Sequence, residues 1–310
     1  MRASSTARLA SSILIVLVAL AVAACSGGSA RPPAPEDPRR PTVTIASFDF
    51  PESQILAEIY AQALRRRGYP VEVVAALGTR EIVEPALEQG KADLIPEYLG
   101  TALDFLSDGG RVATADARRT HGLLRRAFAA RGVTVLDFSP VENRNGYVVS
   151  SAAAREHNLR RLSDLLPLAS RLTFGGPPEC PSRPLCLKGL EEHYGLRFGR
   201  FAPMPSRAVT AAALAAGEID VGMIETTSGT LAISDLVQLE DDRRLQPAEN
   251  IVPAVRTQII DAYGTPLTSV LNAVTRGLTA HELIAMNRSV ELGGEPTEVA
   301  AGWLDDHRLA

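Results

Sequence analysis

Residues 44–103 read TIASFDFPESQILAEIYAQALRRRGYPVEVVAALGTREIVEPALEQGKADLIPEYLGTAL, and the pattern of this stretch decides the fold. Apolar side chains recur at helical spacing from Ile55 to Leu64, behind a proline suited to the first turn of a helix. Short apolar runs precede this helix and the two helical segments that follow it, so they predict strand–helix units. The expected strands are Val43–Ser47, Val71–Ala75 and Asp93–Pro96. The sequence therefore predicts an α/β fold.

The turns of these units carry binding chemistry. They lie at Asp49–Glu52, at Gly78-Thr79 and from Glu97-Tyr98 to Gly100-Thr101. In an open α/β sheet, ligands bind at the carboxyl edge of the strands, and exposed N–H groups at helix starts favour anions. We therefore expect a ligand site at this edge of the sheet.

The middle of the chain is expected to switch to a second lobe. A strand at Val133–Phe138 is followed by the polar stretch Ser139–Asn145 and a new strand at Tyr147–Ser150. The second lobe would then hold a short helix after Asp164, a strand at Leu172–Gly175, a helix ending near Tyr194, a helix at Ala208–Ala216 and a strand at Asp220–Ile224. The chain would return near Leu236–Asp242 and Asn250–Arg256, and end in helices at Leu267–Leu278, His281–Leu292 and Pro296–Asp305. The expected lobes are residues 42–143 with 251–310, and residues 144–250.

The N-terminus resembles a secretory signal. Arg2 and Arg8 precede an apolar run from Ile13 to Ala24 that is short for a membrane span. Small residues then lead to Cys25, as at a bacterial lipoprotein processing site, although an ordinary signal peptide with an incidental cysteine is the alternative. We expect residues 1–25 to be the signal and lipobox, Cys25 to be lipidated, and residues 26–41, which are rich in Gly, Ser and Pro, to form a flexible tether.

Composition restricts the partners. The net charge of −4 and the lack of a Lys/Arg cluster argue against nucleic acid. No other apolar run is long enough to cross a bilayer. The remaining residues are apolar enough to fill two modest cores, as two lobes require.

Two further cysteines, Cys180 and Cys186, enclose a turn-rich loop. In an oxidising compartment such a pair closes a disulfide, which would stabilise the fold by about 2 kcal/mol. Free thiols are the alternative, and a metal site would have only His193 as a nearby further ligand. We expect the disulfide, and no metal or cofactor.

Motifs of common enzymes do not occur. The sequence has no Gly-x-Ser-x-Gly and no phosphate-binding Gly-x-x-x-x-Gly-Lys-Ser/Thr, and His281-Glu282 lacks the second histidine of a zinc-protease helix. The five histidines are scattered. We expect no catalysis.

Several segments together resemble one family, the osmoprotectant substrate-binding proteins of ABC importers, whose solutes are glycine betaine, carnitine and choline. The most specific segment is Pro96–Thr101. The others are Asp49–Glu52, Gly78–Glu81, Asn145–Tyr147, Arg183-Pro184 with Gly189-Leu190, Ala216–Val221, Thr226–Gly229 and Asp235–Asp242. No segment is specific alone, but their order and spacing are.

The resemblance implies a two-lobed type II periplasmic-binding fold that works as a clamshell. The protein would be a lipid-anchored extracytoplasmic monomer that captures a small polar or quaternary-ammonium solute and delivers it to the transmembrane subunits of an ABC permease. A sensory or scavenging lipoprotein that binds a hydroxylated solute without a dedicated permease is the alternative.

The family holds its quaternary ammonium in a cage of aromatic faces, and Tyr98 and Tyr147 match cage positions. Ordinary packing at a strand end is the alternative for both. Thr101 matches a residue that helps to hold the ligand carboxylate, a role compatible with capping a helix. The full set of expected ligand-binding residues is Asp49, Phe50, Tyr98, Thr101, Asn145, Tyr147, Glu225, Thr226 and Thr227.

The cage departs from the family pattern. Leu187 and Glu225 stand where members commonly place aromatic residues, and Phe48 or Phe50 would have to supply substitute faces. A cleft carboxylate at Glu225 would attract cations and repel a ligand carboxylate, unless it points to solvent. Glycine betaine is therefore expected to bind less well than a cationic or hydroxyl-rich solute.

Overall fold

The computed structural model describes residues 40–107, 110–232 and 234–308. The expected signal peptide, Cys25 and most of the expected tether lie outside these residues. No helix in the described ranges has the length and apolar character needed to cross a membrane.

The first lobe contains a five-stranded sheet in the order β2-β1-β3-β10-β4. Strand β1 is parallel to β2 and β3, while β10 is antiparallel to β3 and β4. The strand bounds are Val43–Phe48 (β1), Val71–Gly78 (β2), Leu94–Tyr98 (β3), Val133–Val135 (β4) and Ile251–Arg256 (β10). The returning strand β10 therefore completes a sheet that the N-terminal part of the chain begins.

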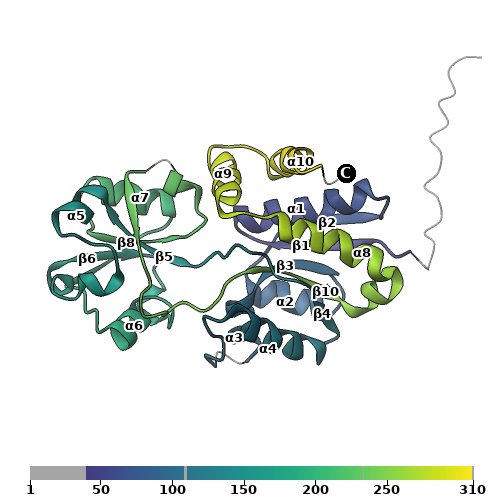
Figure 1. The fold of residues 1–310 in the computed structure, drawn as a ribbon, viewed down its shortest axis with the longest axis horizontal. Helices are drawn as coiled ribbons and strands as arrows, with labels where there is room; N and C mark the ends of the chain where they lie inside the picture. Colours follow the sequence, from purple (N-terminus) through teal and green to yellow (C-terminus); the bar gives the residue numbers. More distant parts are fainter. Residues whose placement is uncertain (1–39, 108–109, 233, 309–310) are drawn as a thin grey trace, which may run out of the picture. The chain divides into compact units, whose positions relative to one another are not determined.

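Helices cover both faces of this sheet (Figure 1). Helix α1 begins at Pro51 and buries the apolar stripe from Ile55 to Leu64 that the sequence predicted. It also buries Glu52, which belongs to the site described below. The helix bounds are Pro51–Arg66 (α1), Arg80–Glu88 (α2), Leu99–Leu106 (α3), Ala117–Ala129 (α4), Thr257–Gly277 (α8), Ala280–Glu291 (α9) and Pro296–Asp306 (α10).

The second lobe has its own sheet in the order β7-β6-β8-β5-β9. Strand β5 is antiparallel to β8 and β9, and β6 is parallel to β7 and β8. The bounds are Asn145–Ser150 (β5), Thr173–Gly176 (β6), Arg200–Pro203 (β7), Val221–Glu225 (β8), Leu236–Leu239 (β9), Ser151–Glu156 (α5), Leu187–Gly189 (α6) and Arg207–Ala215 (α7). Gly222 of β8 lets α7 pack closely, because an added Cβ would lie 2.6 Å from the Thr210 side chain.

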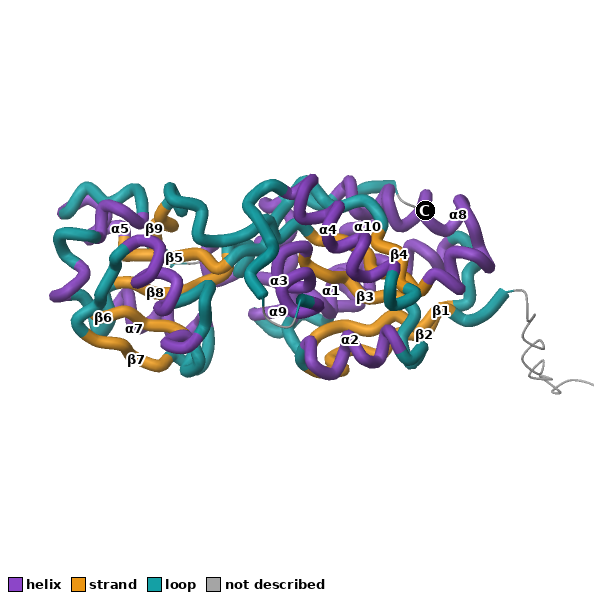
Figure 2. Tube along the Cα trace, turned by 90° about the horizontal axis from the view of Figure 1, so that it is seen from below, coloured by secondary structure: helices purple, strands orange, loops and turns teal. Residues whose placement is uncertain are grey.

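Two segments cross between the lobes, one before β5 and one before β10. Figure 2 shows the two groups of orange strands joined by teal loops. The crossings bond to each other: Ser139 N–H donates to the Ile251 carbonyl (2.8 Å), and Asn143 N–H donates to the Glu249 carbonyl (3.0 Å). The predicted two-lobed α/β fold is confirmed.

Several element limits differ from the predictions. The strand expected to reach Phe138 ends at Val135, and the short helix near Asp164 is a 3-10 turn, Leu162–Leu165. Helix α8 begins ten residues before the expected Leu267, but its direction breaks at Gly264, which has a φ of 65°. Pro266 follows this break and suits the first turn of the second helical segment.

Candidate ligand-binding cleft

A cavity of about 1330 Å³ lies between the carboxyl edge of the first sheet and the facing elements of the second lobe. Among the described residues that line it are two aromatic rings, Phe50 and Tyr98. The charged lining residues are five acids and two arginines: Glu52, Glu225, Asp235, Glu249, Glu291, Arg80 and Arg207. The cleft is therefore acidic, which favours a cation.

Glu52, in the first turn of α1, joins four parts of the chain. Its carboxylate accepts hydrogen bonds from the Tyr98 hydroxyl (2.8 Å), from Asn143 Nδ2 (2.9 Å) in the first crossing and from Asn287 Nδ2 (2.8 Å) in α9. The Thr227 hydroxyl of the second lobe donates as well. Glu52 is only 3% exposed, and its charge is balanced by hydrogen bonds from neutral donors. One side chain thus links both lobes at the floor of the cleft.

Glu249, in the second crossing, fills the N-terminal end of α3. The N–H groups of Gly100 and Thr101 both donate to Glu249 Oε2 at 3.2 Å, and the Thr101 hydroxyl is 3.3 Å from the same oxygen. Thr101 is the residue that the family resemblance assigned to a ligand carboxylate. Glu249 is 3% exposed, and burial raises its pKa to about 8.

Arg80, at the start of α2, is held by a second buried acid. Its Nε and Nη2 atoms donate to the two carboxylate oxygens of Glu97 (2.8 and 3.0 Å), and its guanidinium lies 5.0 Å from the centre of the Phe48 ring. Burial and the nearby Glu97 carboxylate raise the pKa of Glu84, which lies beside this pair, well above its usual range. Arg80 is therefore paired before any ligand arrives.

Glu225 also has a partner that the sequence did not reveal. It lies at the end of β8 and lines the cleft, where both of its oxygens accept from Arg207 of α7. Of the two orientations that the sequence left open for Glu225, the structure has the one that faces the cleft. Its negative charge, however, is compensated, because a paired guanidinium neutralises much of the field of a carboxylate.

The aromatic residues of the cleft come from the first lobe. Phe50 packs between Phe48 and Tyr98, with ring centres 5.8 Å and 6.0 Å apart. Phe48 is buried in the core, while Phe50 is half-buried and lines the cleft. Of the two phenylalanines that the sequence offered as substitute faces, Phe50 lines the cleft and Phe48 does not.

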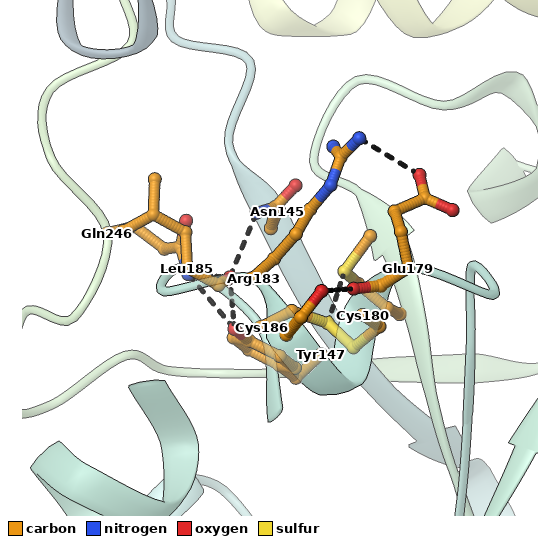
Figure 3. The surroundings of a disulfide bond; sticks show 10 residues. Asn145, Tyr147, Glu179, Cys180, Arg183, Leu185, Cys186 and Gln246 are labelled. Atoms are coloured by element: carbon orange, nitrogen blue, oxygen red, sulfur yellow. Dashed lines mark hydrogen bonds and ion pairs between the residues drawn. A yellow bond between two sulfur atoms is a disulfide. The ribbon is translucent and has the colours of Figure 1, made fainter. Parts of the chain in front are cut away.

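Tyr147 lies elsewhere. It is 1% exposed and packs in the core of the second lobe, 6.2 Å from Phe174 between ring centres. Its hydroxyl donates to the Leu185 carbonyl and accepts from Gln246 Nε2, both at 3.0 Å (Figure 3). The structure therefore does not place it in the expected cage, because an inward-facing position of β5 points it into the core.

The loop between Cys180 and Cys186 ends beside this cluster. The two cysteines form a disulfide with a Cα–Cα distance of 5.2 Å. Besides Tyr147, both Asn145 Nδ2 and Gln246 Nε2 donate to the Leu185 carbonyl at 3.0 Å (Figure 3). Asn145 and Gln246 line the cleft at the two crossings, so the bridged loop holds both in place.

The expected ligand-binding residues divide into those that line the cleft and those that do not. Phe50, Tyr98, Thr101, Asn145, Glu225 and Thr227 line the cleft. Asp49, Tyr147 and Thr226 are not among the lining residues; Asp49 is exposed, and the Thr226 hydroxyl bonds to the backbone of Glu142 and Arg144. Leu187 packs against the second core, and Arg183 pairs with Glu179 near the surface.

Sequence reasoning missed several lining residues, chiefly Glu52, Arg80, Glu249, Asn287 and Arg207. Glu52 and Arg80 lie within segments that carried the family resemblance, so the sequence could have predicted them as lining residues. Glu249 and Asn287 come from parts of the chain that gave no local signal.

The family model for the substrate binding domain of the ABC-type glycine betaine transport system matches residues 41–306. The chain belongs to this family. It is a substrate-binding protein of an ABC transporter, acts outside the cytoplasm and is not an enzyme, as the sequence predicted.

Relatives agree with this assignment. The chain is 27% identical over 280 residues to the glycine-betaine-binding protein of Pseudomonas aeruginosa, covering 86% of this chain and 88% of that protein. It is 26% identical over 273 residues to the glycine betaine-binding protein YehZ of Escherichia coli, covering 84% and 89%. A crystal structure described as a glycine betaine/carnitine/choline ABC transporter shares the fold, with a TM-score of 0.76, 23% identity and coverage of 86% of this chain and 99% of that one.

Proposed function

We propose that the cleft binds a small quaternary-ammonium or similarly polar cation, and that the protein hands this solute to its ABC permease. The observation that carries the proposal is the combination of two aromatic faces, Phe50 and Tyr98, with five acidic lining residues. A quaternary ammonium donates no hydrogen bonds, so aromatic faces and negative charge are the groups that hold it. The glycine-betaine-binding relatives support the same solute class.

The charge state of the lining supports a cation over an anion. Arg80 and Arg207 are the lining arginines, and each already pairs with a glutamate. Glu52, Glu249 and Glu291 accept hydrogen bonds from neutral donors. A positive ligand therefore gains attraction without first separating an ion pair.

A screen by thermal shift tests this proposal. A ligand that binds only the folded protein raises its melting temperature, with about 2.7 kcal/mol of added stability at one hundred times its Kd. The panel contains choline, glycine betaine, carnitine, a polyol and a glycoside. We expect a shift with a quaternary-ammonium compound and a smaller shift, at the same ligand concentration, in Tyr98→Ala. A shift with the polyol or glycoside alone would refute the proposed solute class.

We also propose that the solute is held by closure of the two lobes. Glu52 of the first lobe and Thr227 of the second already share a hydrogen bond, and Ser228 and Thr230 donate to Glu291 of α9. Small-angle scattering of the free and saturated protein is expected to show compaction. A saturated protein with unchanged dimensions would contradict closure.

A lipid anchor completes the proposed function. The basic N-terminus, the apolar run and the small residues before Cys25 support acylation of this cysteine. The wild-type protein, expressed in a bacterial host, is expected to incorporate labelled palmitate and to partition with membranes. Cys25→Ala removes the acceptor, so equal labelling of both proteins would refute the anchor.

A further inference from the structure

The second crossing delivers a carboxylate to a place where a ligand carboxylate would otherwise bind. Helix α3 begins at the carboxyl end of β3, inside the cleft, with Thr101 among the lining residues. Its first N–H groups carry partial positive charge and attract an anion. In this chain, Glu249 already accepts from the N–H groups of Gly100 and Thr101 and from the Thr101 hydroxyl.

The packing around Glu249 keeps its carboxylate there. Gly100 has no side chain, and a Cβ at this position would lie 2.6 Å from Pro247 Cγ and 2.9 Å from the Ala248 carbonyl oxygen. The crossing therefore lies directly against the first turn of α3. The backbone fixes it further, because Leu99 N–H donates to the Asn250 carbonyl (3.2 Å) and Asn143 N–H to the Glu249 carbonyl (3.0 Å).

We propose that Glu249 is the specificity-determining residue of the cleft: its carboxylate occupies the N-terminal end of α3, so the site takes cationic solutes without a carboxylate and discriminates against betaines. The inference rests on the proposed function. A zwitterion that enters the cleft finds the α3 donors already bonded to Glu249, so they are not free to hold the carboxylate of the ligand. A cation with a hydroxyl instead meets a carboxylate able to accept its hydrogen bond.

Choline and glycine betaine form a matched pair of probes. Both carry a trimethylammonium group, and they differ at the other end, where choline has a hydroxyl and glycine betaine a carboxylate. The ratio of their dissociation constants reports on Glu249, because contacts with the shared trimethylammonium group largely cancel in that ratio.

The experiment measures both constants by calorimetry for four proteins. Glu249→Ala empties the end of α3, and Glu249→Gln keeps an oxygen for the α3 donors but removes the charge. Glu192→Gln is the control, since it makes the same substitution at an exposed glutamate that does not line the cleft. Should Glu249→Ala fail to fold, Glu249→Gln carries the test.

We expect the wild-type protein and the control to prefer choline. In Glu249→Ala the ratio is expected to move toward betaine by about tenfold or more, and in Glu249→Gln by a smaller factor, mainly through weaker choline binding. An unchanged ratio in variants that still bind, or a wild-type preference for betaine, would overturn this inference and leave the proposed function intact. Failure of the wild-type protein to bind either probe would overturn both.

Discussion

The two lobes supply different chemistry to the cleft. The first lobe contributes the aromatic rings and Glu52, whose carboxylate is buried and fully bonded. The second contributes the alanine-rich face of α7 and the Glu225–Arg207 pair, in which half of the Arg207 side chain is exposed. The difference indicates that the first lobe supplies preorganised binding groups, whereas the second lobe mainly covers the ligand. Groups that are buried and hydrogen-bonded before the ligand arrives lose little conformational freedom when it binds.

The largest effect is expected from Glu52→Ala, which removes one of the hydrogen-bonded links between the lobes. Four donors from four segments would lose their shared acceptor, and each buried donor left unsatisfied costs about 1–3 kcal/mol. We expect a loss of about 3 kcal/mol or more in the free energy of unfolding, measured by urea denaturation. Glu192→Ala, at an exposed site, is expected to change stability by less than about 0.5 kcal/mol. Similar losses in both would show that Glu52 is not a structural centre.

Paired tyrosine variants compare the two lobes directly. Tyr98→Ala removes an aromatic face worth about 0.5–2 kcal/mol to a bound cation and is expected to weaken binding about tenfold. Tyr147→Phe removes only a hydroxyl bonded within the second lobe, so the affinity should stay the same while stability falls by about 1 kcal/mol. Calorimetry of both variants checks this contrast. Loss of binding in Tyr147→Phe would place part of the cage in the second lobe after all.

The pH dependence of binding tests the role of Glu249, the carboxylate in the second crossing. Burial raises the pKa of Glu249 to about 8, with Arg80 lowering it and Glu97 raising it. A bound cation favours the ionised carboxylate, so binding below this pH releases a proton and the affinity rises as pH increases toward 8. We expect choline, which does not titrate there, to bind several-fold more tightly at pH 8 than at pH 6.

The matched variant for this experiment is Glu249→Gln, whose side chain has no proton to lose. Its choline affinity should be flat across the same range. A wild-type profile that is also flat would show that Glu249 does not change its charge on binding.

The smallest effect is expected at the second lobe. Arg207→Gln releases Glu225 from its partner and leaves a negative charge at the edge of the cleft. Because exposed ion pairs contribute about 1 kcal/mol or less, the affinity for a cation should rise by less than about fivefold. Titration calorimetry at low salt checks this gain. Weaker cation binding in Arg207→Gln would show that Arg207 itself contacts the ligand.

The sequence by itself determined the fold and the family of this protein. The strand–helix pattern from residue 44 to residue 103 reflects local rules of periodicity and turn chemistry, which are legible without long-range information. The same rules placed Phe50, Tyr98 and Thr101 at the carboxyl edge of the sheet, where the structure has them. Each of these residues owes its position to its own strand or helix.

Only the tertiary structure decided which distant residues contact the residues of the cleft. Glu249 reaches Thr101 across 148 positions of sequence, Asn287 reaches Glu52 across 235, and Arg207 reaches Glu225 from a neighbouring helix. Tyr147 matched a cage position in sequence, yet its place on β5 turns it into the core. Charge compensation and side-chain direction depend on how distant segments pack, and no local pattern of residues encodes that packing.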